Sequence, residues 1–119
     1  MYLEDFREYC LAKKGVTEGL PFGPEVLVFK VMNKMFALVS LERLPLQANL
    51  KADPERVPEL REQWDGRILP GYHMNKHHWN TVLLGQLPAS LIRELVDHSY
   101  ELIVASLPKK VRQELEGME

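Results

Sequence analysis

The sequence contains one cysteine, Cys10, among its 119 residues. An internal disulfide and a zinc site built from cysteine pairs are therefore both excluded. Cys10 follows Leu3 and Phe6 at helical spacing, so we expect it to pack as a small apolar side chain. Because disulfides are rare in the cytoplasm, a chain without one is typical of a cytoplasmic protein, and we expect this location.

Long apolar runs are missing as well. The most apolar stretches, around Val26 and Leu102, are short and charged, whereas a membrane span needs about 20 apolar residues. The opening MYLEDFREYC has acids ahead of any apolar core, so we predict no secretory signal. With 45% hydrophobic and 27% charged residues, the composition is that of one globular domain over 1–119. We expect a monomer that does not enter membranes.

Catalytic and cofactor-binding motifs are absent from the chain. The sequence has no P-loop, no GxGxxG, no GxSxG and no HExxH. His73 and His77 are four residues apart, a spacing that suits two metal ligands only on a helix. Pro70-Gly71 before them predicts a turn instead. We therefore predict a non-enzymatic protein with no cofactor and no metal site.

Apolar periodicity indicates the order of the elements. Helical spacing predicts helices over residues 3–14, 53–64, 88–107 and 109–116. Alternating or β-branched runs predict strands over residues 26–32, 35–40, 46–51 and 77–84, the first three as an antiparallel meander with a turn at Asn33-Lys34. The predicted class is α+β, in the order α-β-β-β-α-β-α-α, with the helices packed on one face of an antiparallel sheet.

Acidic residues only slightly outnumber basic ones, but the two kinds are unevenly distributed along the sequence. The net charge is −2, unlike the basic balance of most nucleic-acid-binding domains. No acid lies between Glu25 and Glu42, and none between Asp65 and Glu94. If the helices cover one face of the sheet, the other face is expected to be locally positive. The alternative is that strands carry few acids in any protein and that cations protect sheet edges.

The most unusual stretch is GYHMNKHHWNT, residues 71–81, where aromatic rings lie next to cations. Rings and cations together contact bases and phosphates in nucleic-acid-binding proteins. Lys76 and His77 are the best candidates for exposed contacts. The alternative is a protein- or ligand-binding pocket on the exposed sheet face, lined by Tyr72, His77 and Trp79, although a core position is the more ordinary role of a strand tryptophan.

Several segments resemble the MmcQ/YjbR family of small bacterial proteins. They include EDFREYC, PFGPEVLVFKVMNKMFAL, NLKADPERVPELREQW and, most specifically, PGYHMNKHHWNTV, so that the resemblance covers nearly the whole chain. It implies a fold similar to that of CyaY, the bacterial frataxin. It also implies DNA binding by a double-wing motif, in which loops and strand ends approach the duplex. The matching positions here are Asn33-Lys34 and the stretch 76–79.

The residues and the resemblance together predict a weak, salt-sensitive DNA-binding protein. Binding that depends on lysine contacts to phosphates weakens as salt rises. The residues expected to contact the phosphate backbone are Lys34, Lys51, Arg67, Lys76 and His77.

Overall fold

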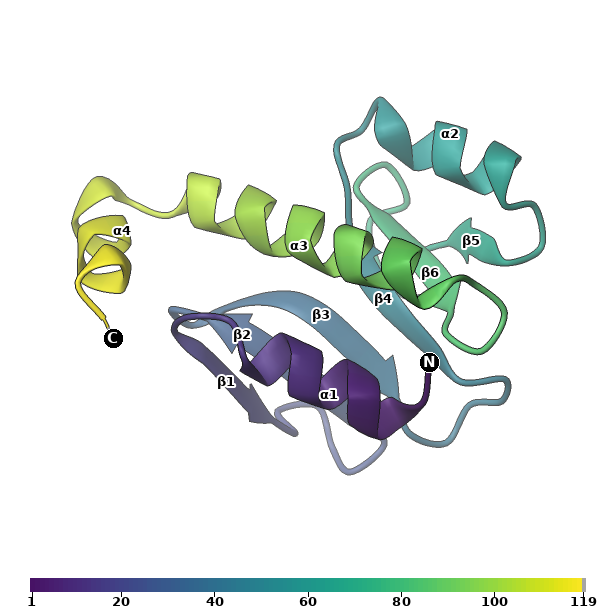
Figure 1. The fold of residues 1–119 in the computed structure, drawn as a ribbon, viewed down its shortest axis with the longest axis horizontal. Helices are drawn as coiled ribbons and strands as arrows, with labels where there is room; N and C mark the ends of the chain where they lie inside the picture. The colour runs from purple at the N-terminus through teal and green to yellow at the C-terminus, as the bar shows by residue number, and fades with distance from the viewer. Residues whose placement is uncertain (119) are drawn as a thin grey trace.

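The computed structural model describes residues 1–118, which form a six-stranded antiparallel sheet and four helices (Figure 1). Glu119, the last residue of the predicted domain, lies outside the described residues. The sheet order is β1-β2-β3-β4-β6-β5. The elements are α1 (Leu3–Leu11), β1 (Val16–Gly19), β2 (Val26–Val31), β3 (Lys34–Ser40), β4 (Gln47–Lys51), α2 (Arg56–Gln63), β5 (Ile68–Pro70), β6 (Trp79–Leu83), α3 (Ala89–Ser106) and α4 (Lys109–Glu116). The predicted α+β class and the antiparallel β2–β3–β4 meander are confirmed.

The predicted order of elements was incomplete, because the sequence pattern did not reveal β1 and β5. Both are edge strands, paired on one side only, with β2 and β6 respectively. Strand β1 has four residues and β5 has three, which is too few for an alternating pattern to be recognised. Pro70 in β5 also lacks the backbone N–H that a strand residue normally donates. Their strand conformation comes from the neighbouring strand rather than from their own sequence.

Two helix ends and one turn differ slightly from the prediction. The first helix ends at Leu11, before Lys14, and Gly15 then takes a positive φ of 74°. Helix α2 begins at Arg56, preceded by a turn in which the Asp53 carbonyl accepts the Arg56 N–H at 2.9 Å.

The β2–β3 connection is Met32-Asn33, one residue earlier than the predicted turn. Both residues have positive φ, 48° and 71°, while Val31 pairs directly with Lys34. Positive φ at both central positions is the geometry of a tight type I′ hairpin.

All four helices contribute to one hydrophobic core on one face of the sheet. The long α3 lies across β2, β3 and β4, with α1 beside it and α2 over β5 and β6 (Figure 1). None of the helices within residues 1–118 is long and apolar enough to cross a membrane. The largest fully buried side chains of this core are Phe6, Phe29, Phe36, Ile68, Leu84 and Ile92.

No helix of residues 1–118 lies on the opposite face of the sheet, and this face has a small cluster of its own. Val28, Leu38 and Trp79 form this cluster, with Val26, Met35 and Met74 packed against it. Strand alternation and register place the following residues on this helix-free face: Thr17, Gly19, Val26, Val28, Lys30, Met35, Leu38, Ser40, Gln47, Asn49, Lys51, Leu69, Trp79, Thr81 and Leu83.

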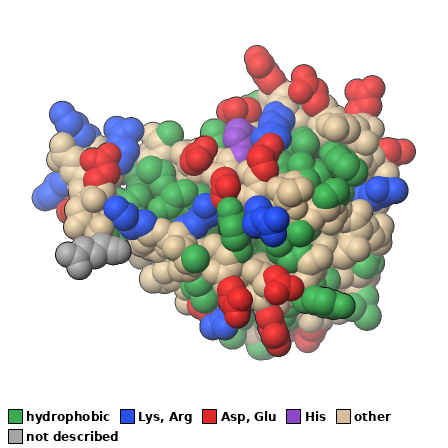
Figure 2. Space-filling view, viewed as in Figure 1, with side chains coloured by type: hydrophobic (Ala, Val, Ile, Leu, Met, Phe, Trp, Pro, Cys, Tyr) green, Lys and Arg blue, Asp and Glu red, His purple; other side chains and the backbone are tan. Residues whose placement is uncertain are grey.

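No carboxylate belongs to this set of strand residues, all of which lie within the described part of the chain. The single strand acid, Glu18, pairs with Phe29 on the helix side and forms an ion pair with Arg7 of α1. Figure 2 shows the helix-covered side, where carboxylates are spread over α1 and α2. The carboxylates of the strands and of these two helices therefore lie away from the helix-free face, while Glu25 and Glu42 belong to connections at its rim.

Candidate functional site on the helix-free face

A pocket of about 500 Å³ opens on the helix-free face. This volume lies within the usual range of small-molecule sites. Its floor is formed by strands β2, β3 and β4, and its rim by three connections: residues 20–25, residues 41–46 and the β5–β6 loop, residues 71–78. The lining residues are Phe22, Val26, Met35, Leu38, Ser40, Arg43, Gln47, Asn49, Tyr72, His73 and Met74.

The β5–β6 loop is fixed to the sheet by hydrogen bonds at its start. The N–H of Gly71 donates to the Trp79 carbonyl at 3.0 Å, and the N–H of Tyr72 donates to Thr81 Oγ1 at 3.0 Å. Asn49 Nδ2 donates to the Tyr72 carbonyl at 3.1 Å, and Asn49 Oδ1 accepts from Thr81 Oγ1 at 2.5 Å. The polar side chains of β4 and β6 therefore determine where the Tyr72 backbone lies.

Helix α2 anchors the same loop from the other face. Arg61 Nε donates to Asn80 Oδ1 at 2.7 Å, and the guanidinium also donates to the carbonyls of Trp79, at 3.2 Å, and Lys76. Asn80 is 2% exposed and donates from Nδ2 to the Val57 carbonyl at 3.3 Å. One buried amide thus joins α2, β6 and the end of the loop.

Arg43 provides the positive charge of the pocket. Its guanidinium carbon lies 3.6 Å from the centroid of the Tyr72 ring, which in turn lies 4.0 Å from the His73 ring centroid. Within residues 1–118 the Arg43 guanidinium donates no hydrogen bond to a protein acceptor and forms no ion pair. Its N–H edge is therefore open to a ligand.

Basic residues gather at one end of the sheet. The register brings together the ends of β2, β4 and β5 and the starts of β3 and β6. Arg67 lies at the opposite end, where its carbonyl accepts from the Leu83 N–H at 3.0 Å. Of the five predicted phosphate contacts, Arg67 is therefore separate from the rest. Lys34 lies at this end of the sheet but on its helix side, where its Nζ donates to Ser106 Oγ of α3 at 3.5 Å. The basic residues at this end, called the basic end below, are Lys30, Lys34, Lys51, Lys76 and His77.

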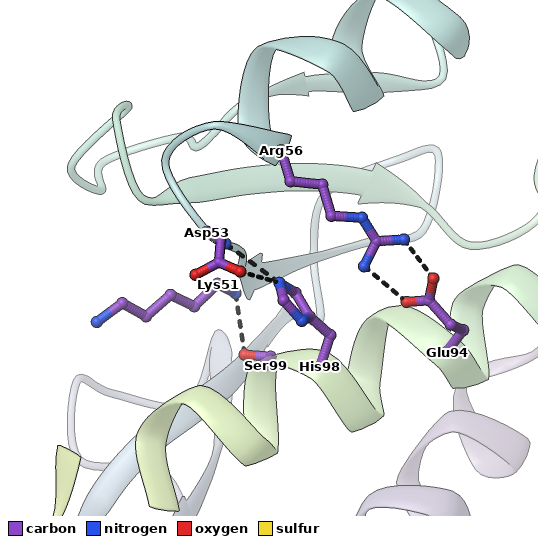
Figure 3. A network of polar contacts seen from close by, with 6 residues as sticks. All are labelled: Lys51, Asp53, Arg56, Glu94, His98 and Ser99. Carbon is purple, nitrogen blue, oxygen red and sulfur yellow. Dashed lines mark hydrogen bonds and ion pairs between the residues drawn. The ribbon is translucent and has the colours of Figure 1, made fainter. Parts of the chain in front are cut away.

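Lys51 leaves the sheet next to a network of polar contacts (Figure 3). Its backbone N–H donates to Ser99 Oγ at 3.0 Å, while Ser99 Oγ donates to the Phe36 carbonyl at 2.6 Å. Beside it, the Asp53 N–H donates to His98 Nε2 at 3.1 Å. Figure 3 shows the Lys51 side chain pointing away from this network, so its ammonium is available for other contacts.

The predicted pocket residues have three different positions. Tyr72 lines the pocket. Trp79 is 8% exposed and lies in the cluster with Val28 and Leu38, outside the pocket lining. His77 is exposed outside the pocket, because β6 begins at Trp79 rather than at residue 77 and the His77 N–H donates to Asn75 Oδ1 at 2.9 Å within a turn.

Sequence reasoning missed Phe22, Arg43 and His73 as lining residues. All three come from connections, where no periodicity assigns a face. A signal was available for Phe22, an aromatic residue between prolines in PFGP, which is 62% exposed in the structure. Arg43 gave no comparable signal.

Shifted pKa values occur on the helix side rather than at the pocket. Burial raises the pKa of the Cys10 thiol to about 12, and the nearby Lys13 opposes this shift. Burial and the hydrogen bond from its hydroxyl to Asp97 raise the pKa of Tyr9 to about 12. Among residues 1–118, no group of three His, Cys, Asp or Glu side chains is placed to hold a metal ion.

Comparisons with known proteins agree over most of the chain. A family model described as YjbR matches residues 11–102. YjbR of Escherichia coli (strain K12) is 38% identical over 115 residues, covering 95% of this chain and 96% of that protein. YbdF of Escherichia coli O157:H7 is 44% identical over 91 residues, covering 76% and 74%.

A solved structure shares the fold. The crystal structure of Deinococcus radiodurans protein DR2400 superposes with a TM-score of 0.89 at 42% identity, covering 96% of this chain and 87% of that one. Sequence and structure therefore agree that the chain belongs to the YjbR family.

Proposed function

We propose that the protein is a non-enzymatic DNA-binding protein that contacts phosphates through the basic end of its sheet. The observation that carries the proposal is the separation of charge. The chain has 17 acids and 15 lysines and arginines, yet no strand residue of the helix-free face is acidic. Over a Debye length of about 8 Å, distant helix carboxylates are screened, so local lysines dominate the potential near a bound backbone.

The shape of the basic end supports the same proposal. The tight β2–β3 hairpin and the β5–β6 loop both leave the sheet there, on either side of Lys51. Two projecting connections with lysines between them fit the double-wing mode of binding that the resemblance implies. We also infer that the meander with its covering helices is a CyaY-type frame.

A salt-titrated measurement with a short fluorescent duplex tests the proposal. If three or four lysines contact phosphates, the logarithm of affinity falls with the logarithm of salt at a slope of about −3 to −4. The double substitution Lys34→Glu/Lys76→Glu is expected to abolish binding.

The matched control is Arg67→Glu/Arg93→Glu, which changes the net charge equally but away from the basic end. We expect this control to retain most of the affinity, although Arg67 was among the predicted contacts. Unchanged binding by the lysine variant, or an equal loss in both variants, contradicts the proposal.

The pocket favours a second function on the same face. An apolar cavity of about 500 Å³ with one open arginine fits a small ligand rather than a duplex. Binding driven by apolar burial is less sensitive to salt than phosphate binding. The two functions are therefore separable by the same salt titration, and they use different residues.

A further inference from the structure

We propose that the pocket on the helix-free face binds a small aromatic anion, with its ring body over the strands and its carboxylate or phosphate on Arg43. This inference rests on the second function above and names its ligand class. It does not depend on the binding of DNA at the basic end.

The apolar part of the pocket selects the ligand body. Val26, Met35 and Leu38 form the floor, while Phe22 and Met74 approach from the rim. Unbranched methionines adapt to the outline of a ring, and sulfur–aromatic contacts are favourable. Phe22 is 62% exposed, so its ring can cover a ligand that lies on the floor. A flat apolar molecule buries the most surface in this space.

Arg43 selects the charge of the ligand. Arg7 pairs with Glu18 and Arg56 pairs with Glu94, whereas Arg43 has no acidic partner within residues 1–118. With the Tyr72 ring against its guanidinium, its N–H edge still projects donors in the fork geometry that binds carboxylate or phosphate.

The rest of the lining does not oppose an anion. No carboxylate is among the lining residues. The neighbouring Ser40 adds a hydroxyl donor. Gln47, whose Nε2 already donates to the Pro45 carbonyl at 3.0 Å, adds its second amide hydrogen. The pocket therefore combines one fixed cation with neutral polar groups, which favours a single negative group on the ligand.

The backbone segments that carry the recognition groups are also held in place before binding. Tyr72, on which Arg43 lies, has its backbone fixed by Asn49 and Thr81. The Arg43 backbone N–H donates to Ser40 Oγ at 3.3 Å. Groups that are already ordered lose less conformational entropy on binding, which raises affinity.

Two fluorescent probes separate the contributions of charge and ring. The anionic probe is 8-anilinonaphthalene-1-sulfonate, and the neutral probe is N-phenyl-1-naphthylamine, which keeps the rings without the sulfonate. We expect both to bind the wild-type protein. Arg43→Gln is expected to weaken the anionic probe about tenfold or more while leaving the neutral probe unchanged. Arg67→Gln, at the far end of the sheet, is the control and is expected to change neither.

Filling the pocket tests whether the probes bind there. Val26→Trp, in β2, is expected to remove binding of both probes. Gln47→Trp, in β4 on the other side of the floor, is expected to have the same effect and replaces the first variant if that one folds poorly. Near-ultraviolet circular dichroism confirms native packing in each variant, because the anionic probe also binds loosely packed states.

Each outcome has a defined meaning. If Arg43→Gln weakens the binding of both probes equally, or of neither, the proposed anion site at Arg43 is wrong, but the proposal of an apolar binding pocket is not affected. If both probes still bind the filled variants, the pocket and the second function fail together.

Competition then identifies the anionic group. Displacement of the anionic probe by 2-naphthoate supports a carboxylate ligand, and displacement by adenosine monophosphate supports a phosphate. Failure of both competitors contradicts the proposal.

Discussion

Arg61 in α2 and Asn80 in β6 are joined by a hydrogen bond of 2.7 Å from Nε to Oδ1. Asn80 is 2% exposed and its other amide atom, Nδ2, donates to the Val57 carbonyl. The arginine reaches past this amide to two carbonyls near the end of the β5–β6 loop. The position of the loop, and with it the pocket rim, is thereby linked to a helix on the opposite face of the sheet.

The first prediction concerns this buried amide. Asn80→Ala leaves the Arg61 Nε–H without its acceptor and removes the side-chain donor to the Val57 carbonyl. We expect it to lower the free energy of unfolding by about 1–3 kcal/mol. Urea denaturation followed by far-ultraviolet circular dichroism measures this change. Gln63→Ala, on the exposed side of the same helix, is the control and is expected to stay within about 0.5 kcal/mol of wild type. Equal stability of the two variants contradicts the prediction.

The second prediction concerns close packing at Gly71. A Cβ atom added there lies 2.8 Å from both Cβ and the carbonyl oxygen of Trp79. Since backbone cannot yield as a flexible side chain does, Gly71→Ala is expected to lower the free energy of unfolding by about 1–3 kcal/mol and to displace the loop. Gly85→Ala, with open space around the added carbon, is the comparison. Thermal unfolding of both proteins decides whether their midpoints separate as expected.

The third prediction concerns the Ser99 hydroxyl. It is fully buried and bridges the Phe36 carbonyl and the Lys51 N–H just beyond the last β3–β4 pair, Ala37 with Leu50. Ser99→Ala leaves both backbone groups unpaired, at a cost of about 1–3 kcal/mol.

The comparison for this hydroxyl is Ser90→Ala, an exposed serine near the start of the same helix. Hydrogen exchange is the more specific measurement, because the Lys51 amide is expected to lose protection only in Ser99→Ala. Retained protection of that amide shows that the bridge does not hold the strand end.

The fourth prediction concerns alkaline pH. Burial raises the pKa of Cys10 from 9.0 to about 12, so between these values the unfolded chain releases a proton that the folded chain keeps. The folded state then binds more protons, and its stability falls as pH rises above 9.0, by up to about 1.4 kcal/mol per pH unit from this residue. Denaturation midpoints of wild type and Cys10→Ala over this range are the measurement. The alanine variant, less stable at neutral pH, is expected to show the shallower decline.

The long, regular elements could be predicted from the sequence. Helix α3 has an uninterrupted apolar stripe that includes Ile92, Leu95 and Val96, and the β2–β4 meander has β-branched or alternating runs. These patterns require only local periodicity, which the chain displays directly. The buried position of Trp79 also follows from strand alternation, although the cluster that surrounds it lies on the helix-free face.

The pocket could not be predicted in the same way. Its rim combines Phe22, Arg43 and Tyr72 from three connections that are far apart in the sequence. Strand register and the direction of the connections bring these residues together. The apolar periodicity of the sequence predicts neither of them. A start of β6 two residues later than predicted was enough to move His77 out of the site. The proposed ligand site therefore lies mainly in the segments where sequence patterns are weakest.

The core under the helices and the cluster beneath the pocket share no buried residue. The sheet thus separates the main core under the helices from the small cluster beneath the pocket on the helix-free face. Substitutions in separate clusters without shared partners tend to have additive effects on stability. Substitutions among the side chains of the helix-free face are therefore expected to leave the packing under the helices unchanged.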